Sequence, residues 1–485
     1  MYLGLDLGTS GATALLLGPG LEVLGRASRP VHTSYPHPGH VEQDPHALLA
    51  AVRQVAAEVL EVVPTGAPLL GAGFANPGES VLAWDARTGD PLTPVLVWSD
   101  TRSSDLCEQV KARGLELLVL ELSGLRPDPY FCASKFAWLL EHSPETRRAR
   151  EDGSLRLSTL DAWIAVQLGG PYVTDHSTAS RTQLYDRGNG GWSPELLGLF
   201  GVPSKALPDI RPGLSPLGEL HLGPHRVPWT AALLDQVAAL VGNGCLDPGE
   251  VKVTYGTGAF VLAQAGRELA PAPPTLLQTV GLSGNGWREF ILDGGVYSAG
   301  SALTWLERLG VLARAADASE LAEWATGAPL RFLPAFSGLG APWWQAEARG
   351  VLSGLSGQSG PAEVTRAVLD GIASRVTDIL EVMGEVLPHL HRVRADGGLA
   401  QNRYLIRRQA DLSGLTVERS EEHEATALGV ALAAGVSAGA LGWNQVRERT
   451  SAAQVCTPTL SPGEREQERA RWHRWREQAA ALSTE

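Results

Sequence analysis

Two short glycine-rich turns carry the residue types best suited to hold a phosphate group. The first turn reads Asp6-Leu-Gly-Thr-Ser-Gly11, and the second reads Thr254-Tyr-Gly-Thr-Gly258. Successive backbone N–H groups with little side-chain bulk can surround a phosphate, and a neighbouring carboxylate can bind its Mg²⁺. One such turn alone is more often an ordinary hairpin, whereas two in equivalent contexts favour a shared role.

Two further polar groups have both a chemical and a structural interpretation. Asp396-Gly-Gly398 precedes Asn402, and a backbone with so little bulk could lie flat against an adenine or ribose. The alternative is a plain turn that leads into a helix. Asp235-Gln236 begins the apolar segment 237–241, where an aspartate also serves as an ordinary helix cap.

Apolar segments on both sides of each turn predict the strands that position these residues. A strand–turn–strand pattern spans residues 2–17, and the same pattern returns over residues 251–264. The repetition predicts an internal duplication at about half the chain length. We therefore expect an α/β fold with two similar domains, residues 1–241 and 242–485, and a cleft between them.

The remaining pattern is mostly helical. Apolar residues at helical spacing predict helices over residues 45–63, 101–168 and 363–387. Proline and glycine are frequent in residues 202–228, so we expect that segment to be mostly loop. From residue 464 onward, arginine and glutamate alternate with tryptophan, which predicts a surface helix with a solvated charged face.

The composition of the chain excludes several classes of function. Its 485 residues carry a formal charge of −13, which argues against nucleic acid as a partner because phosphate backbones need a basic face. The chain contains no run of about 18 apolar residues, so the sequence predicts no membrane span. Four scattered cysteines without C-x-x-C spacing indicate reduced thiols in a cytoplasmic protein. The P-loop and the protein-kinase signatures are also absent.

An ordered series of motifs resembles the FGGY carbohydrate kinases, and within them the glycerol kinase branch. The resemblance extends from Leu3 to about Gly442 and so covers nearly the whole chain. No single motif is decisive, but their order is specific. The motifs are Gly4-Leu-Asp-Leu-Gly-Thr-Ser10, His37-Pro-Gly-His-Val-Glu-Gln-Asp-Pro45, Asp128-Pro-Tyr-Phe131 with Lys135 and Trp138, Ser158-Thr-Leu-Asp-Ala-Trp163, Val173-Thr-Asp-His-Ser-Thr-Ala-Ser-Arg-Thr182, Asp235-Gln236, Tyr255-Gly-Thr-Gly258, Pro334-Ala-Phe-Ser-Gly-Leu-Gly-Ala-Pro342, Asp396-Gly-Gly398 and Glu424-Ala-Thr-Ala-Leu-Gly429.

The resemblance implies two actin-like, ribonuclease-H-type domains with an interdomain catalytic cleft, and it assigns roles to individual residues. Asp235 matches the catalytic base of the family, and Asp6 and Asp235 are the expected Mg²⁺ ligands. The positions that match contacts with the acceptor molecule are Glu79, Trp98, Tyr130, Gln236 and Phe260. The positions expected to contact ATP are Thr9, Ser10, Thr257, Gly294, Gly398 and Asn402.

Two departures from the motifs of that branch each remove a positive charge from the expected site. Gly78 stands where relatives carry an arginine that holds adjacent hydroxyls, and the space it leaves predicts an acceptor larger than glycerol. Thr13 stands where relatives carry a basic residue that reaches the transferred phosphate. Either another residue such as Arg181 substitutes, or the enzyme is slow, or the change is simply tolerated.

We therefore expect an ATP- and Mg²⁺-dependent kinase for a hydroxyl of glycerol or a somewhat larger polyol. Two alternatives stay open at this point: a pentulose (xylulose-type) kinase of the same fold, and a degenerate kinase that acts as a ligand and nucleotide sensor. The expected partner is a small polyol or sugar, with neither nucleic acid nor membrane involved. Relatives often form dimers or tetramers, but no segment of this chain marks such an interface.

Overall fold

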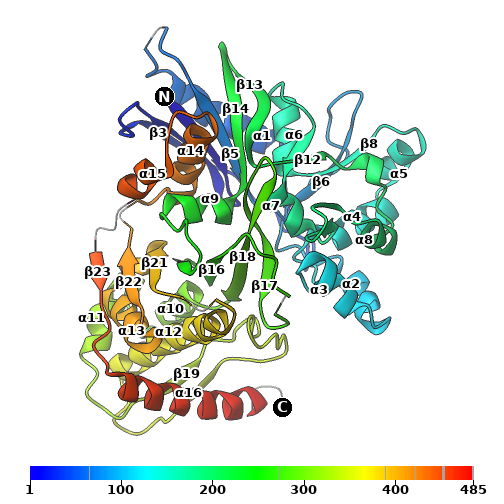
Figure 1. Ribbon diagram of the computed structural model, residues 1–485. Coiled ribbons are helices and arrows are strands. Elements are labelled where there is room, and N and C mark those ends of the chain that lie inside the picture. The colour runs from blue at the N-terminus through cyan, green and yellow to red at the C-terminus, as the bar shows by residue number, and fades with distance from the viewer. Residues whose placement is uncertain (65, 272, 388, 421, 451–453, 483–485) are drawn as a thin grey trace.

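The computed structural model describes residues 1–64, 66–271, 273–387, 389–420, 422–450 and 454–482. Two mixed β-sheets form the centre of the two halves, with helices packed around them, and the chain runs from the upper to the lower half of Figure 1. The α/β architecture with two similar halves agrees with the expectation from the sequence.

The first sheet has the strand order β13-β14-β5-β1-β2-β3. β1 pairs antiparallel with β2 and parallel with β5, and β5 in turn pairs parallel with β14. These strands are β1 (Tyr2–Leu7), β2 (Gly11–Leu17), β3 (Val23–Pro30), β5 (Gly71–Asn76), β13 (Leu214–Leu222) and β14 (His225–Leu234).

The second sheet repeats this topology, with the order β17-β18-β16-β15-β21-β22-β23. β15 pairs antiparallel with β16 and parallel with β21, as β1 does with β2 and β5. The strands are β15 (Glu250–Tyr255), β16 (Ala259–Gly266), β17 (Leu277–Gly284), β18 (Trp287–Val296), β21 (Arg392–Asp396), β22 (Thr416–Arg419) and β23 (Gln454–Cys456). The duplication expected from the two glycine turns is therefore confirmed.

Helices and small sheets complete each half. In the first half they include a four-stranded sheet of order β4-β7-β6-β8. The first-half elements are β4 (Glu42–Gln43), α1 (Pro45–Leu60), β6 (Val81–Asp85), β7 (Val95–Leu96), α2 (Ser104–Ala112), α3 (Glu116–Ser123), α4 (Cys132–His142), α5 (Pro144–Glu151), β8 (Leu155–Thr159), α6 (Leu160–Gln167), β9 (Val173–Asp175), α7 (His176–Ala179), η1 (Ser180–Thr182), β10 (Tyr185–Asp186), β11 (Gly191–Trp192), α8 (Pro194–Phe200), η2 (Ser204–Ala206), β12 (Asp209–Arg211) and α9 (Asp235–Gly242). Those of the second half are α10 (Gly300–Arg308), η3 (Ala315–Asp317), α11 (Ala318–Glu323), β19 (Arg331–Leu333), β20 (Val351–Ser353), α12 (Pro361–Val386), η4 (Gly398–Gln401), α13 (Arg403–Ser413), α14 (Ala425–Ser437), α15 (Trp443–Arg449) and α16 (Pro462–Leu482).

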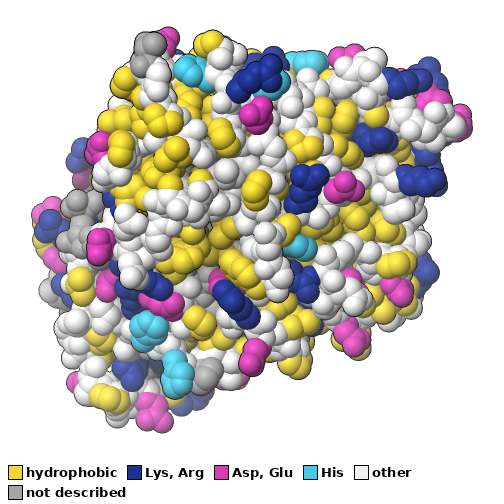
Figure 2. Space-filling view, turned by 45° about the horizontal axis from the view of Figure 1, so that its top comes forward, with side chains coloured by type: hydrophobic (Ala, Val, Ile, Leu, Met, Phe, Trp, Pro, Cys, Tyr) yellow, Lys and Arg dark blue, Asp and Glu magenta, His cyan; other side chains and the backbone are white. Residues whose placement is uncertain are grey.

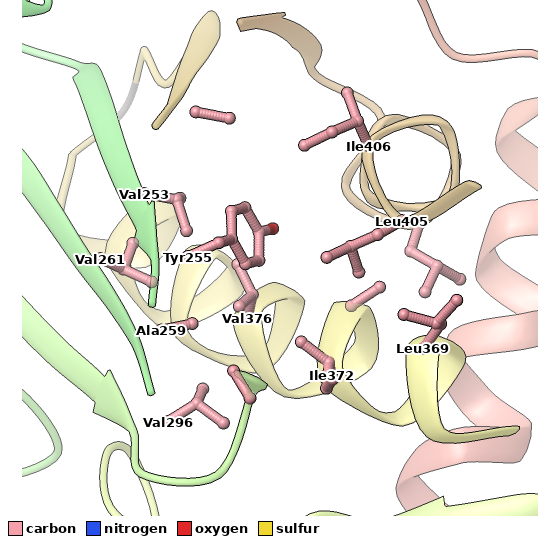
Figure 3. Close-up of a cluster of buried hydrophobic side chains, with 14 of the residues drawn as sticks. Val253, Tyr255, Ala259, Val261, Val296, Leu369, Ile372, Val376, Leu405 and Ile406 are labelled. Carbon is pink, nitrogen blue, oxygen red and sulfur yellow. The ribbon is translucent and has the colours of Figure 1, made fainter. Parts of the chain in front are cut away.

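The core of the second half lies between its sheet and the long helix α12. Tyr255 of β15, Ile372 and Val376 of α12, and Leu405 of α13 point toward one another there (Figure 3). These four side chains are fully buried. Because the second glycine turn directly follows Tyr255, this packing holds one end of the turn on a rigid support.

The segment from residue 202 to 228 contradicts the expectation that it is mostly loop. More than half of it is strand: β12 and β13 lie within it and its last residues begin β14, so that the β13–β14 hairpin closes the first sheet at one edge. Pro216 and Gly218 lie in β13, where the register between the two strands shifts. An edge strand with a bulge tolerates such residues, because its outer groups need no ladder partner.

The helices α9 and α14 connect the two halves. α14 follows the second sheet in sequence, yet it packs on β1, β5 and α9 of the first half, as its orange ribbon shows beside the blue strands in Figure 1. Gly429 allows this close contact, because a Cβ there would lie 1.8 Å from the carbonyl oxygen of Ala238. The boundary at residue 241 stays a prediction, and α14 lies with the first sheet.

Substitution of Gly429 by alanine is expected to destabilise the protein by about 1–3 kcal/mol, because the added methyl group forces α9 and α14 apart. Urea unfolding measures this change. Gly198 of α8 is the matched control, since a Cβ there meets no atom within 4 Å. Its replacement by alanine is expected to stabilise the protein by about 0.5–1 kcal/mol. Equal effects of both changes would contradict the close contact.

The charged face of the C-terminal helix is only partly solvated, which corrects the expectation for this segment. Arg469, Trp472 and Arg476 of α16 are buried. Arg469 bonds to Asp378 and Glu381 of α12, so the helix is attached to the second half by ion pairs. The sequence pattern could not reveal this, because the partner carboxylates lie about a hundred residues away on another helix.

Candidate active site

Asp235 lies at the point where β14 ends and α9 begins, in the connection between the two halves. Its carboxylate accepts a hydrogen bond from the backbone N–H of Gln236 at 2.6 Å. Burial, followed by the negative charge of Glu79, raises the pKa of Asp235 to about 7, although Lys252 and Arg181 act in the opposite direction. A carboxylate with such a pKa is a stronger proton acceptor than an ordinary aspartate.

Asp6 lies near the end of β1, and its Oδ1 is enclosed without a hydrogen-bond partner among the described residues. Burial raises its pKa well above the usual range, and the charges of Asp235 and Glu424 raise it further. An enclosed, unpartnered carboxylate oxygen on which two further negative charges act suits a divalent cation. The residues therefore fit the expected Mg²⁺. Glu424 belongs to a quoted motif, but the sequence assigned it no role.

Each glycine turn is closed by an internal backbone hydrogen bond, which spans three residues in the first turn and two in the second. Gly8 N–H donates to the carbonyl oxygen of Gly11, and Gly256 N–H donates to that of Gly258, both at 2.8 Å. Thr9 is joined to the acceptor side of the site, since the indole N–H of Trp98 donates to its hydroxyl oxygen at 2.9 Å. Ser10 is exposed at the tip of the first turn.

Gly300, which the sequence analysis did not single out, lies against the second turn. Its N–H donates to the carbonyl oxygen of Gly256, and a Cβ at this position would lie only 2.5 Å from that oxygen. Gly294 lies inside β18, and a Cβ there would meet Ile379 of α12 at 2.8 Å. The nucleotide contact expected of Gly294 stays a prediction, and Gly300 is a further candidate because it lies directly against the second turn.

The segment from Asp396 to Asn402 offers space and donors next to the second turn. Gly397 has a φ of +86°, and a Cβ there would lie 2.5 Å from the carbonyl oxygen of Tyr255, so only glycine fits. A Cβ at Gly398 would meet no atom within 4 Å. Asn402 caps α13 with its side-chain oxygen, while its Nδ2 is enclosed and unpartnered among the described residues. This geometry suits a flat nucleotide ring beside Gly398.

The expected acceptor-binding residues come together around Asp235. The rings of Trp98 and Tyr130 lie 5.4 Å apart, centroid to centroid. Glu79 is buried, and its charge acts on both Tyr130 and Asp235. Phe260 of β16 reaches the boundary between the halves, where it packs on the cluster of apolar residues that includes Leu234.

Lys135 bonds to the backbone of several expected acceptor-binding residues. The sequence analysis quoted it only as part of a motif. Its Nζ is fully buried and donates to the carbonyl oxygen of Tyr130 at 2.6 Å. The carbonyl oxygens of Glu79, Phe131 and Trp98 lie within 3.3–3.4 Å of the same atom. Because one ammonium group holds the backbone of three expected acceptor-binding residues, Lys135 fixes their relative positions.

Lys252 is a second cation that the sequence analysis missed. It lies in β15, two residues before the second turn, and its Nζ donates to Gln236 Oε1 at 2.7 Å and to Thr254 Oγ1 at 2.9 Å. Its charge acts on Asp235, so the second half supplies a positive group to the base of the first half. The signal in the sequence was weak, because Lys252 alternates with valines in a strand that also contains Glu250 and Thr254.

The chain matches known proteins over nearly its whole length. Residues 1–242 match the N-terminal domain of the FGGY family of carbohydrate kinases, and residues 251–438 match the C-terminal domain. A glycerol kinase of Halorhodospira halophila is 38% identical over 481 residues, with 97% of this chain and 95% of that protein covered. A glycerol kinase of Thermus brockianus is 40% identical over 446 residues, with 90% of each chain covered.

Solved structures agree with this assignment. The crystal structure of Plasmodium falciparum glycerol kinase with ADP superimposes with a TM-score of 0.94 at 27% identity, covering 98% of this chain and 97% of that one. A xyloylose kinase from Brucella ovis, at 24% identity, has a TM-score of 0.90 with 99% of each chain covered, and this likeness shows the shared fold.

This chain belongs to the FGGY family of carbohydrate kinases. It is an ATP-dependent kinase that phosphorylates a hydroxyl of a small polyol or sugar. None of the described helices is long and apolar enough to cross a membrane. On the face shown in Figure 2, basic and acidic side chains are interspersed, and no continuous basic area suited to nucleic acid is visible there.

Proposed function

We propose that this kinase phosphorylates glycerol, with Asp235 as the catalytic base. The observation that carries the proposal is the position of Asp235 at the junction of the two halves, where the charges of Glu79, Arg181 and Lys252 all act on it. The relatives at 38% and 40% identity are both glycerol kinases, which supports the same acceptor. Trp98 and Tyr130 present aromatic faces suited to the carbon chain of a short polyol.

Each group of residues has a defined task in the proposed reaction. Asp235 accepts the proton of the acceptor hydroxyl as that oxygen attacks the γ-phosphorus of ATP, and the bond from the γ-phosphorus to the β,γ-bridging oxygen breaks to release ADP. The turns at Thr9 and Thr257 hold the phosphates with backbone N–H groups, and Gly300, Gly398 and Asn402 hold the nucleotide. Mg²⁺, when bound at Asp6 and Asp235, neutralises phosphate charge during transfer.

Gly78 does not favour an acceptor larger than glycerol. A Cβ at Gly78 would lie 2.6 Å from Leu234 Cδ1 and 3.3 Å from the Cβ and Cγ atoms of Arg181. Because these side chains fill the space beside Gly78, the loss of an arginine at this position leaves no extra room. A small acceptor therefore suits the site better than the larger polyol that the sequence suggested.

A panel of acceptors tests the proposal directly. Purified protein with Mg²⁺-ATP is assayed for ADP release with glycerol, erythritol, xylitol, D-xylulose and D-ribulose. We expect glycerol to give the highest kcat/KM, by about tenfold or more over each of the others. A preference for D-xylulose would favour the pentulose kinase. Nucleotide binding without turnover of any acceptor would favour the sensor.

Two further properties belong to the same proposal. All four cysteines are free thiols, and Cys107, Cys132 and Cys245 are buried, which supports a reducing compartment such as the cytoplasm. We also propose association into dimers or tetramers, as relatives often do. Light scattering at micromolar concentration measures the oligomeric state.

A further inference from the structure

Another arginine, Arg181, lies beside Gly78, the position where relatives carry an arginine. Arg181 lies in η1, and the Cβ and Cγ atoms of its side chain would lie only 3.3 Å from a Cβ added at Gly78. The Arg181 residue is only 3% exposed, so its guanidinium lies in the interior of the protein and not in solvent. An arginine side chain at 78 and the present path of Arg181 would compete for the same space.

The guanidinium of Arg181 is oriented by two carboxylates. Its Nε donates to Glu79 Oε1 at 2.5 Å, and its Nη1 donates to Asp293 Oδ2 at 3.0 Å. The guanidinium carbon also lies 5.8 Å from the ring centroid of Tyr130. A planar guanidinium held by two hydrogen bonds has a fixed orientation, which a single ammonium group cannot reproduce.

The third nitrogen of the guanidinium, Nη2, bonds to no acceptor in the part of the chain that the structure describes. Nη2 is also not among the fully enclosed polar atoms that lack a partner. Its N–H donors therefore remain accessible beside Glu79 and Tyr130. A hydroxyl of a bound polyol is a natural acceptor for them, because a guanidinium offers five donors and two are used by the carboxylates.

The two anchors of Arg181 come from different halves of the molecule. Glu79 follows β5 in the first half, whereas Asp293 lies in β18 of the second half. The pair Arg181–Asp293 therefore joins the acceptor side of the site to the sheet that carries the second glycine turn. Removal of the guanidinium would leave Glu79 as an uncompensated buried charge beside the acceptor.

We propose that Arg181 supplies the acceptor-binding guanidinium of this kinase in place of an arginine at position 78, with Glu79 and Asp293 as its anchors. This inference rests on the proposed function. It assigns Arg181 to the acceptor side of the reaction and not to the phosphate beside Thr13. The hydroxyl of Thr13 lies 3.0 Å from that of Ser28, and the ion pairs of Arg181 lead to Glu79 and Asp293.

The test compares Arg181→Lys with wild type for glycerol and for propane-1,2-diol, which lacks one hydroxyl. We expect the KM for glycerol to rise about 10- to 100-fold, as loss of a charged hydrogen bond to a ligand does. The KM for ATP should stay within about twofold. The preference for glycerol over propane-1,2-diol should fall about tenfold, a change that a purely structural role would not produce.

Arg469→Lys is the matched control. Arg469 is also a buried arginine held between two carboxylates, Asp378 and Glu381, but it contacts none of the proposed site residues. Its substitution should leave both KM values within about twofold. An unchanged KM for glycerol and an unchanged acceptor preference in Arg181→Lys would overturn the inference, while wild-type turnover would leave the proposed function intact.

Asp293→Asn decides the question if Arg181→Lys does not fold. This variant keeps the guanidinium and weakens one anchor, so the KM for glycerol should rise about three- to tenfold with an unchanged KM for ATP. No change in the KM for glycerol would count against the inference. If the wild-type protein phosphorylates none of the acceptors, the proposed function fails and this inference fails with it.

Discussion

Asp235→Asn is expected to lower the rate of phosphoryl transfer about 10²- to 10⁴-fold, the usual contribution of a general base. The amide keeps the size and the backbone hydrogen bond of the carboxylate, but it cannot accept the proton of the attacking hydroxyl. The site should therefore still assemble around the acceptor and the nucleotide. Steady-state release of ADP with glycerol measures kcat, and calorimetric titration measures ADP binding.

Asp161→Asn is the matched control for this prediction. Asp161 is also a buried carboxylate, but its oxygens accept hydrogen bonds from Thr159 and Thr174, and it belongs to no proposed site. Its kcat should stay within about twofold of wild type. Full turnover by Asp235→Asn would exclude a role as base, and ADP binding with no turnover even in the wild type would favour the sensor.

Asp378→Ala is expected to destabilise the protein by about 3–5 kcal/mol, the usual effect of removing one partner from a buried ion pair. Asp378 is fully buried and accepts hydrogen bonds from Arg375, Arg469 and the indole N–H of Trp472. Burial alone would raise its pKa, but hydrogen bonding with His473 and the charges of both arginines hold it below the usual range. Without this carboxylate, two buried cations lose their common partner, and Glu381 alone remains to pair with Arg469 of α16.

Urea unfolding followed by tryptophan fluorescence measures the loss, because Trp472 lies in the affected helix. Asp317→Ala is the control, since Asp317 pairs with the exposed Arg314 on the surface. That change should cost no more than about 1 kcal/mol. Similar midpoints for Asp378→Ala and wild type would contradict the role of the buried cluster in holding the C-terminal helix.

The local parts of the site were predictable from the sequence. Glycine at Gly397 is dictated by a positive φ and by a close contact with the carbonyl oxygen of Tyr255 that admits no side chain, and the two short Gly-Thr turns are visible as local patterns. The motif around Asp235 marked this residue as the candidate base through its resemblance to the family. The duplicated pattern of strand, turn and strand predicted two similar sheets, because strand patterning and tight turns are local properties.

The long-range cations could not be predicted. Lys135, Lys252 and Arg181 occupy ordinary positions in a helix, a strand and a short turn, and their partners lie on other elements. Residue 181 is 102 positions from Glu79 and 112 from Asp293. The hairpin of β13 and β14 was missed for a related reason, because its proline and glycine indicate a loop unless the sheet edge and the bulge are known.

The sequence alone determined the family, the two-domain α/β fold and the turns that suit phosphate, since these depend on local residue types and their order. Only the tertiary structure decided which cations lie beside the expected site. It brings Arg181 to Glu79 within the first half, and it joins Arg181 to Asp293 and Lys252 to Gln236 across the boundary of the two halves. The reason is physical: a buried charge requires a partner, and the partner is chosen by which elements meet in space, not by their separation along the chain.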